Sequence, residues 1–466
     1  MVFSRYSAPE FDPYGDARAL PGEDVWAAPT AEGAVNATIE LPGSKSLTNR
    51  ELVLAALAEG PSLLRAPLHS RDSALMIEAL RALGTTVREA GASGAFGSDL
   101  VIEPTAELLG STTIDCGLAG TVMRFVPPLA ALALGPTTFD GDRYAYQRPM
   151  GATIASLRSL GVDVADDGRG ALPFTVHGSG SVRGGETVID ASRSSQFVSA
   201  LLLAGARFEE GLHLRHEGQT LPSQPHIEMT IASLAARGVT VDTPSPGEWR
   251  IAAQSIAGAD VMIEPDLSTA APFLGAALAT GGRVRLRNWP TDTTQVGAHL
   301  ERILPLFGAL VERDGDDLVV TGGEEIRGID LDLSAGGELA PALVALAALA
   351  NEPSTVTGIG HIRHHESNRL AALATEINGL GGAVTELEDG LQIEPRTLHG
   401  GRWRTYSDHR MAHAGALIGL VVPGVQIEDI ATTSKTLPQF PELWTALAQS
   451  VTADSAALGE LTADGG

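Results

Sequence analysis

The chain has 466 residues and a formal net charge of −25, from 32 basic and 57 acidic side chains. At about 150 residues per domain it should form two or three domains, and 44% hydrophobic with 19% charged residues is typical of a globular protein. The negative charge argues against nucleic-acid or membrane partners, because both need a basic surface. With a single cysteine, Cys116, and no Cys/His cluster, we expect no disulfide, no metal and a cytoplasmic location.

The two ends of the chain differ from the rest. Residues 1–26 mix acids, prolines and aromatics without a basic start or an apolar run, so we expect a poorly ordered extension and not a signal peptide. The acidic, small-residue end at 451–466 predicts a flexible tail. The apolar run 339–350 is too short to cross a bilayer and predicts a buried helix.

A helix end followed by glycine and then by β-branched residues recurs at intervals of roughly 70–77 residues. Glycine ends a helix in the left-handed conformation, and a strand should follow each time. The glycines of this series are Gly84, Gly161, Gly238, Gly308 and Gly381.

A second series consists of Ala/Leu-rich helices with polar openings near residues 44, 119, 194, 266, 338 and 407. The two series predict six units, each with two helices and several strands, which excludes the all-strand blades of a propeller. Many of these helix openings carry Ser, Lys or Arg. Since helix N-termini attract anions, we expect them to converge on one anion site.

Only two of the 32 basic residues are lysine, Lys45 and Lys435, and both lie in motif-like loops. Coding bias alone would explain the scarcity. The placement instead favours sites that need a compact charge with a shiftable pKa, which a guanidinium does not offer.

The remaining candidates follow in chain order. The stretch PGSKSLTNR at 42–50 puts hydroxyls, Lys45 and Arg50 at a helix start, without the spacing of a Walker loop. At 118–124, small residues would allow either close approach of a ligand or close helix packing. Arg148 lies on a turn and suits a carboxylate or phosphate. Farther along, Ser194, Ser195 and Gln196 offer more donors than a helix cap needs.

The cluster at 361–369 combines arginines, histidines and Glu366, which could shift pKa values for acid–base work or form a solvated face. Asp408, His409, Arg410 and Lys435 complete the basic groups. Taken singly these motifs are weak. Their recurrence at equivalent positions of the repeat favours a common site.

In order, the motifs PGSKSLTNR, AGTVMRF, RPM, SSQFVSALLLAG, PSQPHI, ESNR, DHRMA and SKTLP resemble the 5-enolpyruvylshikimate-3-phosphate synthase family. The resemblance implies an α/β fold, a two-domain inverse α/β barrel built from six βαβαββ repeats with three per domain. It implies a discontinuous first domain of 27–43 plus 265–450 and a second domain of 44–264.

The implied reaction transfers the enolpyruvyl group of phosphoenolpyruvate to the 5-hydroxyl of shikimate 3-phosphate through a tetrahedral ketal in an interdomain cleft, with release of phosphate. The resemblance implies no cofactor and a monomer. Two phosphates and two carboxylates would have to be held together, so basic groups must offset their repulsion.

Residue by residue, the resemblance assigns three overlapping sets. The phosphoenolpyruvate set is Lys45, Gly120, Arg124, Arg148, Gln196, Arg369, Arg410 and Lys435. The shikimate 3-phosphate set is Lys45, Ser46, Arg50, Ser194, Ser195, Gln196, Ser223, Glu338, His361 and His365. The catalytic set is Lys45, Glu338, Glu366 and His365, with Glu366 serving the methylene carbon.

Four positions depart from the family pattern, all on the shikimate side. Glu338 stands where the family commonly has the aspartate base for the 5-hydroxyl, and His365, His361 and His226 replace a lysine, an asparagine and a tyrosine. Because histidine is a weaker cation near pH 7, we expect affinity for shikimate 3-phosphate to fall between pH 6 and 8 as His365 loses its proton.

Three alternatives remain at the level of sequence. A UDP-N-acetylglucosamine enolpyruvyl transferase would commonly use a loop cysteine, whereas we expect Cys116 to pack in the core. An RNA-terminal phosphate cyclase would need a basic stripe, which the charge disfavours. A non-catalytic phosphometabolite-binding protein is distinguished only by assay.

Overall fold

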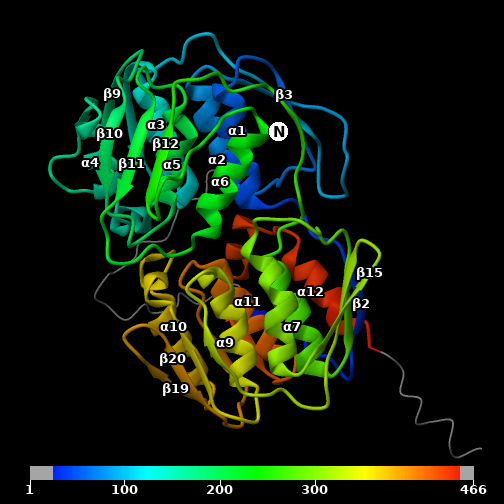
Figure 1. Ribbon diagram of the computed structural model, residues 1–466. Helices are drawn as coiled ribbons and strands as arrows, with labels where there is room; N and C mark the ends of the chain where they lie inside the picture. The colour runs from blue at the N-terminus through cyan, green and yellow to red at the C-terminus, as the bar shows by residue number, and fades with distance from the viewer. Residues whose placement is uncertain (1–24, 452–466) are drawn as a thin grey trace, which may run out of the picture.

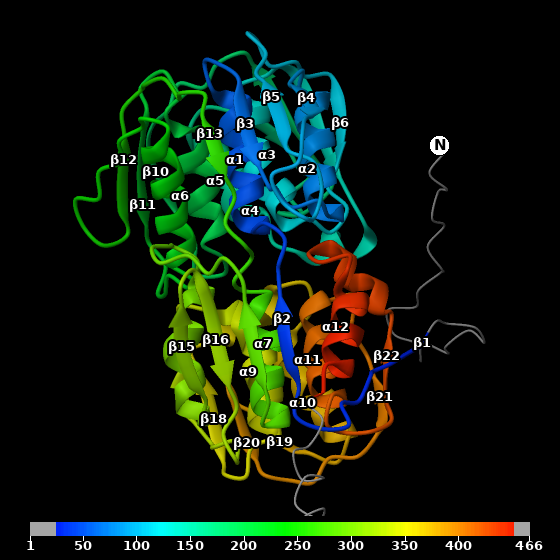
Figure 2. The ribbon, with the colours of Figure 1, turned by 90° about the vertical axis from the view of Figure 1, so that its right-hand side faces the viewer.

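The computed structural model describes residues 25–451, which form two lobes with separate hydrophobic cores (Figure 1). The core of the upper lobe lies between Leu52 and Ile256. The core of the lower lobe combines residues 28–41 with residues 267–448. The chain therefore passes between the lobes twice. The two connections run side by side, because Ser44 N donates to Glu264 O at 2.7 Å and Asp266 N donates to Pro42 O at 2.9 Å (Figure 2).

Each lobe places its most apolar helices at the centre and its sheets outside. In the upper lobe α1 (Lys45–Leu57), α3 (Gly120–Ala131) and α5 (Gln196–Gly205) pack on one another, and every residue of α3 is buried. Three more helices flank them, namely α2 (Arg71–Ala82), α4 (Gly151–Ser159) and α6 (Pro225–Ala236).

Three sheets surround these helices among the described residues of the upper lobe. One has the order β13 (Asp260–Met262), β3 (Ser62–Arg65), β5 (Leu100–Glu103), β4 (Thr86–Glu89). The second has the order β6 (Thr112–Asp115), β7 (Leu134–Asp140), β9 (Phe174–Ser179), β8 (Asp163–Ala165). The third has the order β10 (Gly185–Ile189), β11 (Leu212–His216), β12 (Glu248–Ile251).

The lower lobe repeats this plan. Its central helices are α7 (Ala270–Thr280), α9 (Ala340–Ala348) and α11 (His409–Gly419), with α8 (Leu300–Ile303), α10 (Arg369–Gly379) and α12 (Phe440–Gln449) around them. Three sheets lie around these helices within residues 25–451. One has the order β15 (Leu310–Asp314), β16 (Asp317–Thr321), β14 (Arg283–Leu286), β2 (Asn36–Ile39), and the second has the order β17 (Asp330–Asp332), β18 (Ser354–Thr357), β20 (Leu391–Glu394), β19 (Ala383–Glu386). The third has the order β1 (Val25–Ala27), β22 (Val425–Glu428), β21 (Gly401–Trp403).

Both predicted series are present. The six Ala/Leu-rich helices begin within four residues of the predicted positions. The five glycines all have left-handed φ, between 81° and 101°. The strand expected after Gly238 is wrong, because this stretch forms only an isolated bridge between Asp242 and Arg250. Pro244 and Pro246 follow at once and remove the backbone donors that a ladder needs.

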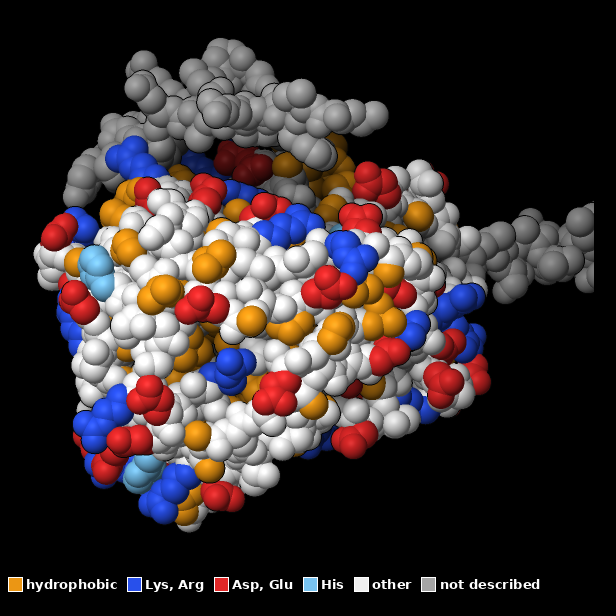
Figure 3. Space-filling model, turned by 90° about the horizontal axis from the view of Figure 1, so that it is seen from above, with side chains coloured by type: hydrophobic (Ala, Val, Ile, Leu, Met, Phe, Trp, Pro, Cys, Tyr) orange, Lys and Arg blue, Asp and Glu red, His pale blue; other side chains and the backbone are white. Residues whose placement is uncertain are grey.

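The predicted extension is wrong at its last two residues. Val25 and Trp26 belong to β1, which pairs antiparallel with β22. At the other end Val451 bridges to Val35. Residues 1–24 and 452–466, the rest of the expected extension and tail, lie outside the described residues. Within the described part, no helix is long and apolar enough to cross a membrane. The upper face intersperses acidic with basic side chains and carries no broad basic patch among the residues described there (Figure 3).

Candidate active site

A pocket between the lobes collects most of the residues that the sequence singled out. Its lining includes Lys45, Ser46, Arg124, Arg148, Ser194, Ser195, Gln196, Ser223, Glu338, His361, His365, Glu366, Arg369 and Arg410. Six cationic side chains line it against three carboxylates, Asp266, Glu338 and Glu366. In a chain of net charge −25, this local excess of positive charge makes the pocket a site for anions.

Helix N-termini point at this pocket, as expected. The first turns of α1, α3, α5 and α11 contribute Lys45, Thr121, Gln196 and Arg410 to its lining. Glu338 lies in the 3₁₀ turn just before α9. The partial positive charge of these helix ends adds to that of the side chains.

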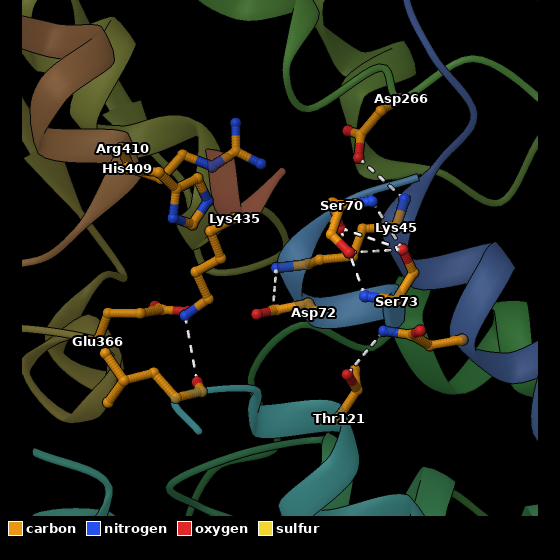
Figure 4. A network of polar contacts seen from close by, with 12 residues as sticks. Lys45, Ser70, Asp72, Ser73, Thr121, Asp266, Glu366, His409, Arg410 and Lys435 are labelled. Atoms are coloured by element: carbon orange, nitrogen blue, oxygen red, sulfur yellow. Dashed lines mark hydrogen bonds and ion pairs between the residues drawn. The ribbon is translucent and has the colours of Figure 1, made fainter. Parts of the chain in front are cut away.

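Lys45 is held at the pocket wall by a carboxylate that the sequence analysis missed. Its Nζ lies 3.6 Å from Oδ2 of Asp72, which is 2% exposed, and its backbone N donates to Asp266 Oδ2 at 3.1 Å (Figure 4). Burial lowers the pKa of Lys45, and the charge of Asp72 opposes this effect. Lys45 is thus a largely buried ammonium, with 18% of its side chain exposed, whose charge is stabilised by a buried counter-ion.

Glu366 lies between two cations. Lys435 Nζ donates to its Oε1 at 2.9 Å, and Arg369 Nη2 donates to its Oε2 at 2.9 Å. Burial would raise the pKa of Glu366, but the charges of Lys435 and Arg369 outweigh it and hold that pKa well below its usual range. Arg369 is itself fixed by two hydrogen bonds to Asp408, of 2.8 and 3.0 Å. Glu366 is therefore ionised.

Lys435 and Gly120 lie just behind the lining. Lys435 Nζ donates to the Leu118 carbonyl oxygen at 3.2 Å (Figure 4). This hydrogen bond joins the two lobes just before the N-terminus of α3. A Cβ added at Gly120 would lie 2.7 Å from Nη2 of Arg148, so the absence of a side chain makes room for that guanidinium. Arg148 Nη1 also donates to Leu118 O, at 2.9 Å. Gly120 thus shapes the site through Arg148.

Arg124 completes the cationic wall of the upper lobe. Its Nη1 donates to Gln196 Oε1 at 2.6 Å, and its guanidinium lies over the ring of Phe197, 5.2 Å from the centroid. Burial lowers the pKa of Arg124 to about 9, which leaves it charged at neutral pH. Nε of both Arg124 and Arg148 is buried without a hydrogen-bond partner among the described residues. Both guanidinium groups therefore retain donor capacity.

The expected titration of His365 near pH 7 is wrong. Its Nδ1 accepts a hydrogen bond from Arg369 Nη1 at 3.0 Å. Burial and the neighbouring charge of Arg369 hold the pKa of His365 well below its usual value. His361, whose ring centroid is 5.5 Å away, also has a pKa lowered by burial. Both imidazoles face the pocket as neutral hydrogen-bonding groups.

Arg50 does not line the pocket, contrary to expectation. It is 1% exposed, and its donors bind Thr230 Oγ1 at 2.8 Å, Ser46 O at 2.9 Å and His226 O at 2.9 Å. The side chain therefore ties α1 to α6 and positions Ser46 and His226 from behind.

Glu338 and His226, two departures from the family pattern, contact each other. His226 Nε2 lies 2.8 Å from Glu338 Oε1. Burial would raise the pKa of Glu338, but the charge and hydrogen bond of His226, aided by Arg410, lower it to about 2. Glu338 is therefore an ionised carboxylate.

Sequence reasoning also missed Arg193, Asp266 and Ser268, which line the pocket. Ser268 accepts two hydrogen bonds of 2.6 Å from Arg410, through its carbonyl and hydroxyl oxygens. The cap-like opening DLST could have identified Asp266 and Ser268. Nothing in the sequence signalled Asp72 or Arg193. Within residues 25–451, no group of three or more His, Cys, Asp and Glu side chains could hold a metal ion.

Comparisons with known proteins match most of the chain. The profile of the EPSP synthase (3-phosphoshikimate 1-carboxyvinyltransferase) family matches residues 29–444. A 3-phosphoshikimate 1-carboxyvinyltransferase of Kocuria rhizophila is 58% identical over 433 residues, 92% of this chain and 97% of the relative. An EPSP synthase structure from Acinetobacter baumannii superposes with a TM-score of 0.74 at 24% identity, covering 90% of this chain and 97% of that one. The enolpyruvyl transferase NikO from Streptomyces tendae gives 0.73 at 18% identity, covering 92% and 98%.

Proposed function

Because this chain belongs to the EPSP synthase family, it transfers the enolpyruvyl group of phosphoenolpyruvate to the 5-hydroxyl of shikimate 3-phosphate, and we propose that the transfer takes place in the pocket between the lobes. The observation that carries the proposal is the excess of cations in this pocket, six against three carboxylates, within an acidic chain. Both substrates carry a phosphate and a carboxylate. Their mutual repulsion has to be offset where they meet.

Phosphoenolpyruvate binds on the side of Lys45, Arg124, Arg148, Arg369 and Arg410 in this proposal. Lys435 and Gln196 complete the set, and Gly120 acts by leaving space for Arg148. The unpartnered Nε atoms of Arg124 and Arg148 support this placement, because a buried donor needs an acceptor. Shikimate 3-phosphate binds on the side of Ser194, Ser195, Ser223 and Glu338, with Ser46, Gln196, His361 and His365.

The chemistry uses two of the three pocket carboxylates, Glu338 and Glu366. The 5-hydroxyl oxygen attacks C2 of phosphoenolpyruvate while Glu338 takes the hydroxyl proton, and a proton from Glu366 goes to the methylene carbon. This gives a tetrahedral ketal. In the second step Glu366 takes a proton back from the methyl carbon and phosphate leaves, stabilised by the cations around Lys45.

Glu366 must gain a proton before it can give one. It is ionised because the charges of Lys435 and Arg369 hold its pKa well below the usual range. The phosphate and carboxylate of phosphoenolpyruvate compete for these cations, which raises the pKa of Glu366 as the substrate binds. Substrate binding thereby prepares the acid that the reaction needs.

We also propose that residues 44–264 form one domain and that residues 27–43 with 265–450 form the other, each built of three βαβαββ units in an inverse α/β barrel. Three sheets around three central helices in each lobe support this division. A cytoplasmic monomer is the proposed state. Size-exclusion chromatography with light scattering tests the oligomeric part, and a mass near 97 kDa, about twice 48.3 kDa, would contradict it.

The assay measures phosphate release with both substrates and with each omitted. We expect release only with both, and a fall of orders of magnitude in Lys45→Met and in Glu366→Gln. Arg65→Met and Glu210→Gln, in exposed ion pairs, are matched controls that should keep full activity. Near-normal rates in both pocket variants would show that the reaction does not take place in this pocket.

The burial of Cys116, which is 0% exposed and outside the pocket lining, disfavours a mechanism with a loop cysteine.

A further inference from the structure

The contact between His226 and Glu338 crosses from one lobe to the other. His226 lies in the first turn of α6 in the upper lobe, and Glu338 lies in the 3₁₀ turn before α9 in the lower lobe. Their side chains are 20% and 15% exposed, and the N–O distance is 2.8 Å. A backbone hydrogen bond from Ser223 N to Ser334 O, of 3.2 Å, joins the same two segments. The contact therefore exists only while the lobes stand together as they do here.

The partner of the imidazole fixes its protonation at one nitrogen. An ionised carboxylate only accepts hydrogen bonds, so His226 Nε2 must carry a hydrogen and donate it to Glu338 Oε1. The side chain of Glu338 makes its other hydrogen bond with its own backbone amide. Among the described residues, the Glu338 carboxylate has no hydrogen-bonding partner other than His226 and that amide.

We propose that His226 is a positioning residue for Glu338, holding its carboxylate across the lobe boundary in the orientation that accepts the 5-hydroxyl proton, so that the base is assembled only when the lobes close. This inference rests on the proposed function of Glu338. In the step it serves, the O–H bond of the acceptor breaks, its oxygen forms the new bond to C2 of phosphoenolpyruvate, and the proton goes to Glu338. His226 keeps its Nε2 hydrogen throughout.

The other charged groups around Glu338 do not replace this contact. Those that influence it electrostatically are Arg50, His299, His361, Arg369 and Arg410. Burial lowers the pKa of both His299 and His361, so these two are neutral at pH 7. Burial lowers the pKa of Arg50 to about 9, so at neutral and acidic pH, where the acidic limb lies, it remains charged. Loss of the His226 side chain therefore removes the directed hydrogen bond and the electrostatic effect of the imidazole on Glu338, and leaves the arginine charges in place.

The test compares His226→Phe with His226→Gln. Phenylalanine keeps a ring without a donor, and glutamine restores an N–H. Neither disturbs the backbone carbonyl of residue 226 that accepts from Arg50. We expect His226→Phe to lower kcat about 10- to 100-fold through misorientation of the base. The KM for phosphoenolpyruvate should stay unchanged, and the acidic limb of the kcat profile should move to higher pH. His226→Gln should recover most of kcat.

The control and the double variant make the result specific. His299→Phe removes a histidine that interacts with Glu338 electrostatically but makes no hydrogen bond to it, and this variant should keep the parental kcat and pH profile. If His226 acts through Glu338, then Glu338→Gln with His226→Phe should be no slower than Glu338→Gln alone. Circular dichroism and thermal melting confirm that each variant is folded.

Two failures are distinguishable. If Glu338→Gln retains parental kcat, the proposed role of Glu338 as base is wrong and the inference falls with it. The inference alone is overturned, and the role of Glu338 stands, if Glu338→Gln is inactive while His226→Phe keeps both kcat and the acidic limb. The same holds if the loss of kcat in the double variant equals the product of the losses in the two single variants. Failure of glutamine to restore kcat also contradicts a role through the donated hydrogen bond.

Discussion

Replacing Asp72 by asparagine removes the buried negative charge beside Lys45 while it keeps the shape of the side chain. Asp72 is 2% exposed, the Lys45 side chain is 18% exposed, and Asp72 Oδ2 lies 3.6 Å from Lys45 Nζ, so water screens the pair only in part. Burial, Lys435 and Arg410 all lower the pKa of Lys45, and Asp72 is the strongest influence that raises it. Without Asp72 the remaining influences should bring Lys45 closer to neutrality.

The size of the effect follows from the distance. At an effective dielectric constant of about 20, two unit charges 3.6 Å apart interact by about 4–5 kcal/mol. At about 1.4 kcal/mol per pKa unit this corresponds to about three units. Glu366 still raises the pKa of Lys45, and water can enter beside asparagine, so we expect the pKa of Lys45 to fall by less than this interaction alone implies. Since anionic phosphoenolpyruvate needs Lys45 protonated, the basic limb of kcat/KM should move to lower pH by the same amount.

The measurement is phosphate release at saturating shikimate 3-phosphate, with phosphoenolpyruvate varied, from mildly acidic to alkaline pH. Asp260→Asn, in an exposed ion pair with Arg65, makes the same chemical change elsewhere and should leave the profile as it is. A basic limb in Asp72→Asn that coincides with that of the parent chain would refute the reasoning. A uniform loss at every pH would also refute it, because that outcome indicates damaged packing instead of a shifted charge.

Three further predictions concern other parts of the molecule. Gly120→Ala brings a Cβ to 2.7 Å from Arg148 Nη2 and should raise the KM for phosphoenolpyruvate about tenfold, about 1.4 kcal/mol, whereas Gly60→Ala, with open space around it, should change nothing. Phosphoenolpyruvate binding should take up a proton at Glu366, measured by calorimetry in buffers of different ionisation enthalpy; undiminished uptake in Glu366→Gln would contradict this. Buried His413 has a pKa well below its usual value and no partner for either ring nitrogen among the described residues, so the unfolded state binds its proton first as pH falls. Stability should therefore drop by about 1.4 kcal/mol per pH unit below about 6.5, and the melting temperature of His413→Phe should fall less steeply between pH 7 and 5.

Much of the fold could be predicted because its signals are local. A glycine that ends a helix and a polar cap that begins one act through neighbouring backbone groups, so both series are legible in the sequence. The Ala/Leu-rich stretches then became the central helices, since an apolar surface on all sides is stable only when buried. The missing strand after Gly238 shows the limit: two prolines in the next few residues outweighed the pattern.

The parts of the site that could not be predicted depend on long-range contacts. Asp72 looks like an ordinary residue in the first turn of a helix, and it becomes the counter-ion of Lys45 only when α1 and α2 pack together. The resemblance placed Arg50 among the residues that bind shikimate 3-phosphate. In the fold Arg50 is buried against α6, where oxygen atoms of the protein accept its hydrogen bonds. His365 was expected to titrate because the sequence shows its residue type but not its burial, which together with the charge of Arg369 holds the pKa of His365 well below its usual value.

The pair of Glu338 and His226 shows why departures from a family pattern need the structure to be interpreted. The sequence presents a longer acid and a histidine, 112 residues apart, as two separate changes. The fold puts one in each lobe and brings them to 2.8 Å. The extra methylene of glutamate gives the carboxylate more reach and also more rotamers, so a fixed donor is needed to restrict it. The two changes therefore belong together: the histidine supplies the restraint that the longer side chain requires, and it can do so only while the two lobes stand together as they do in this structure.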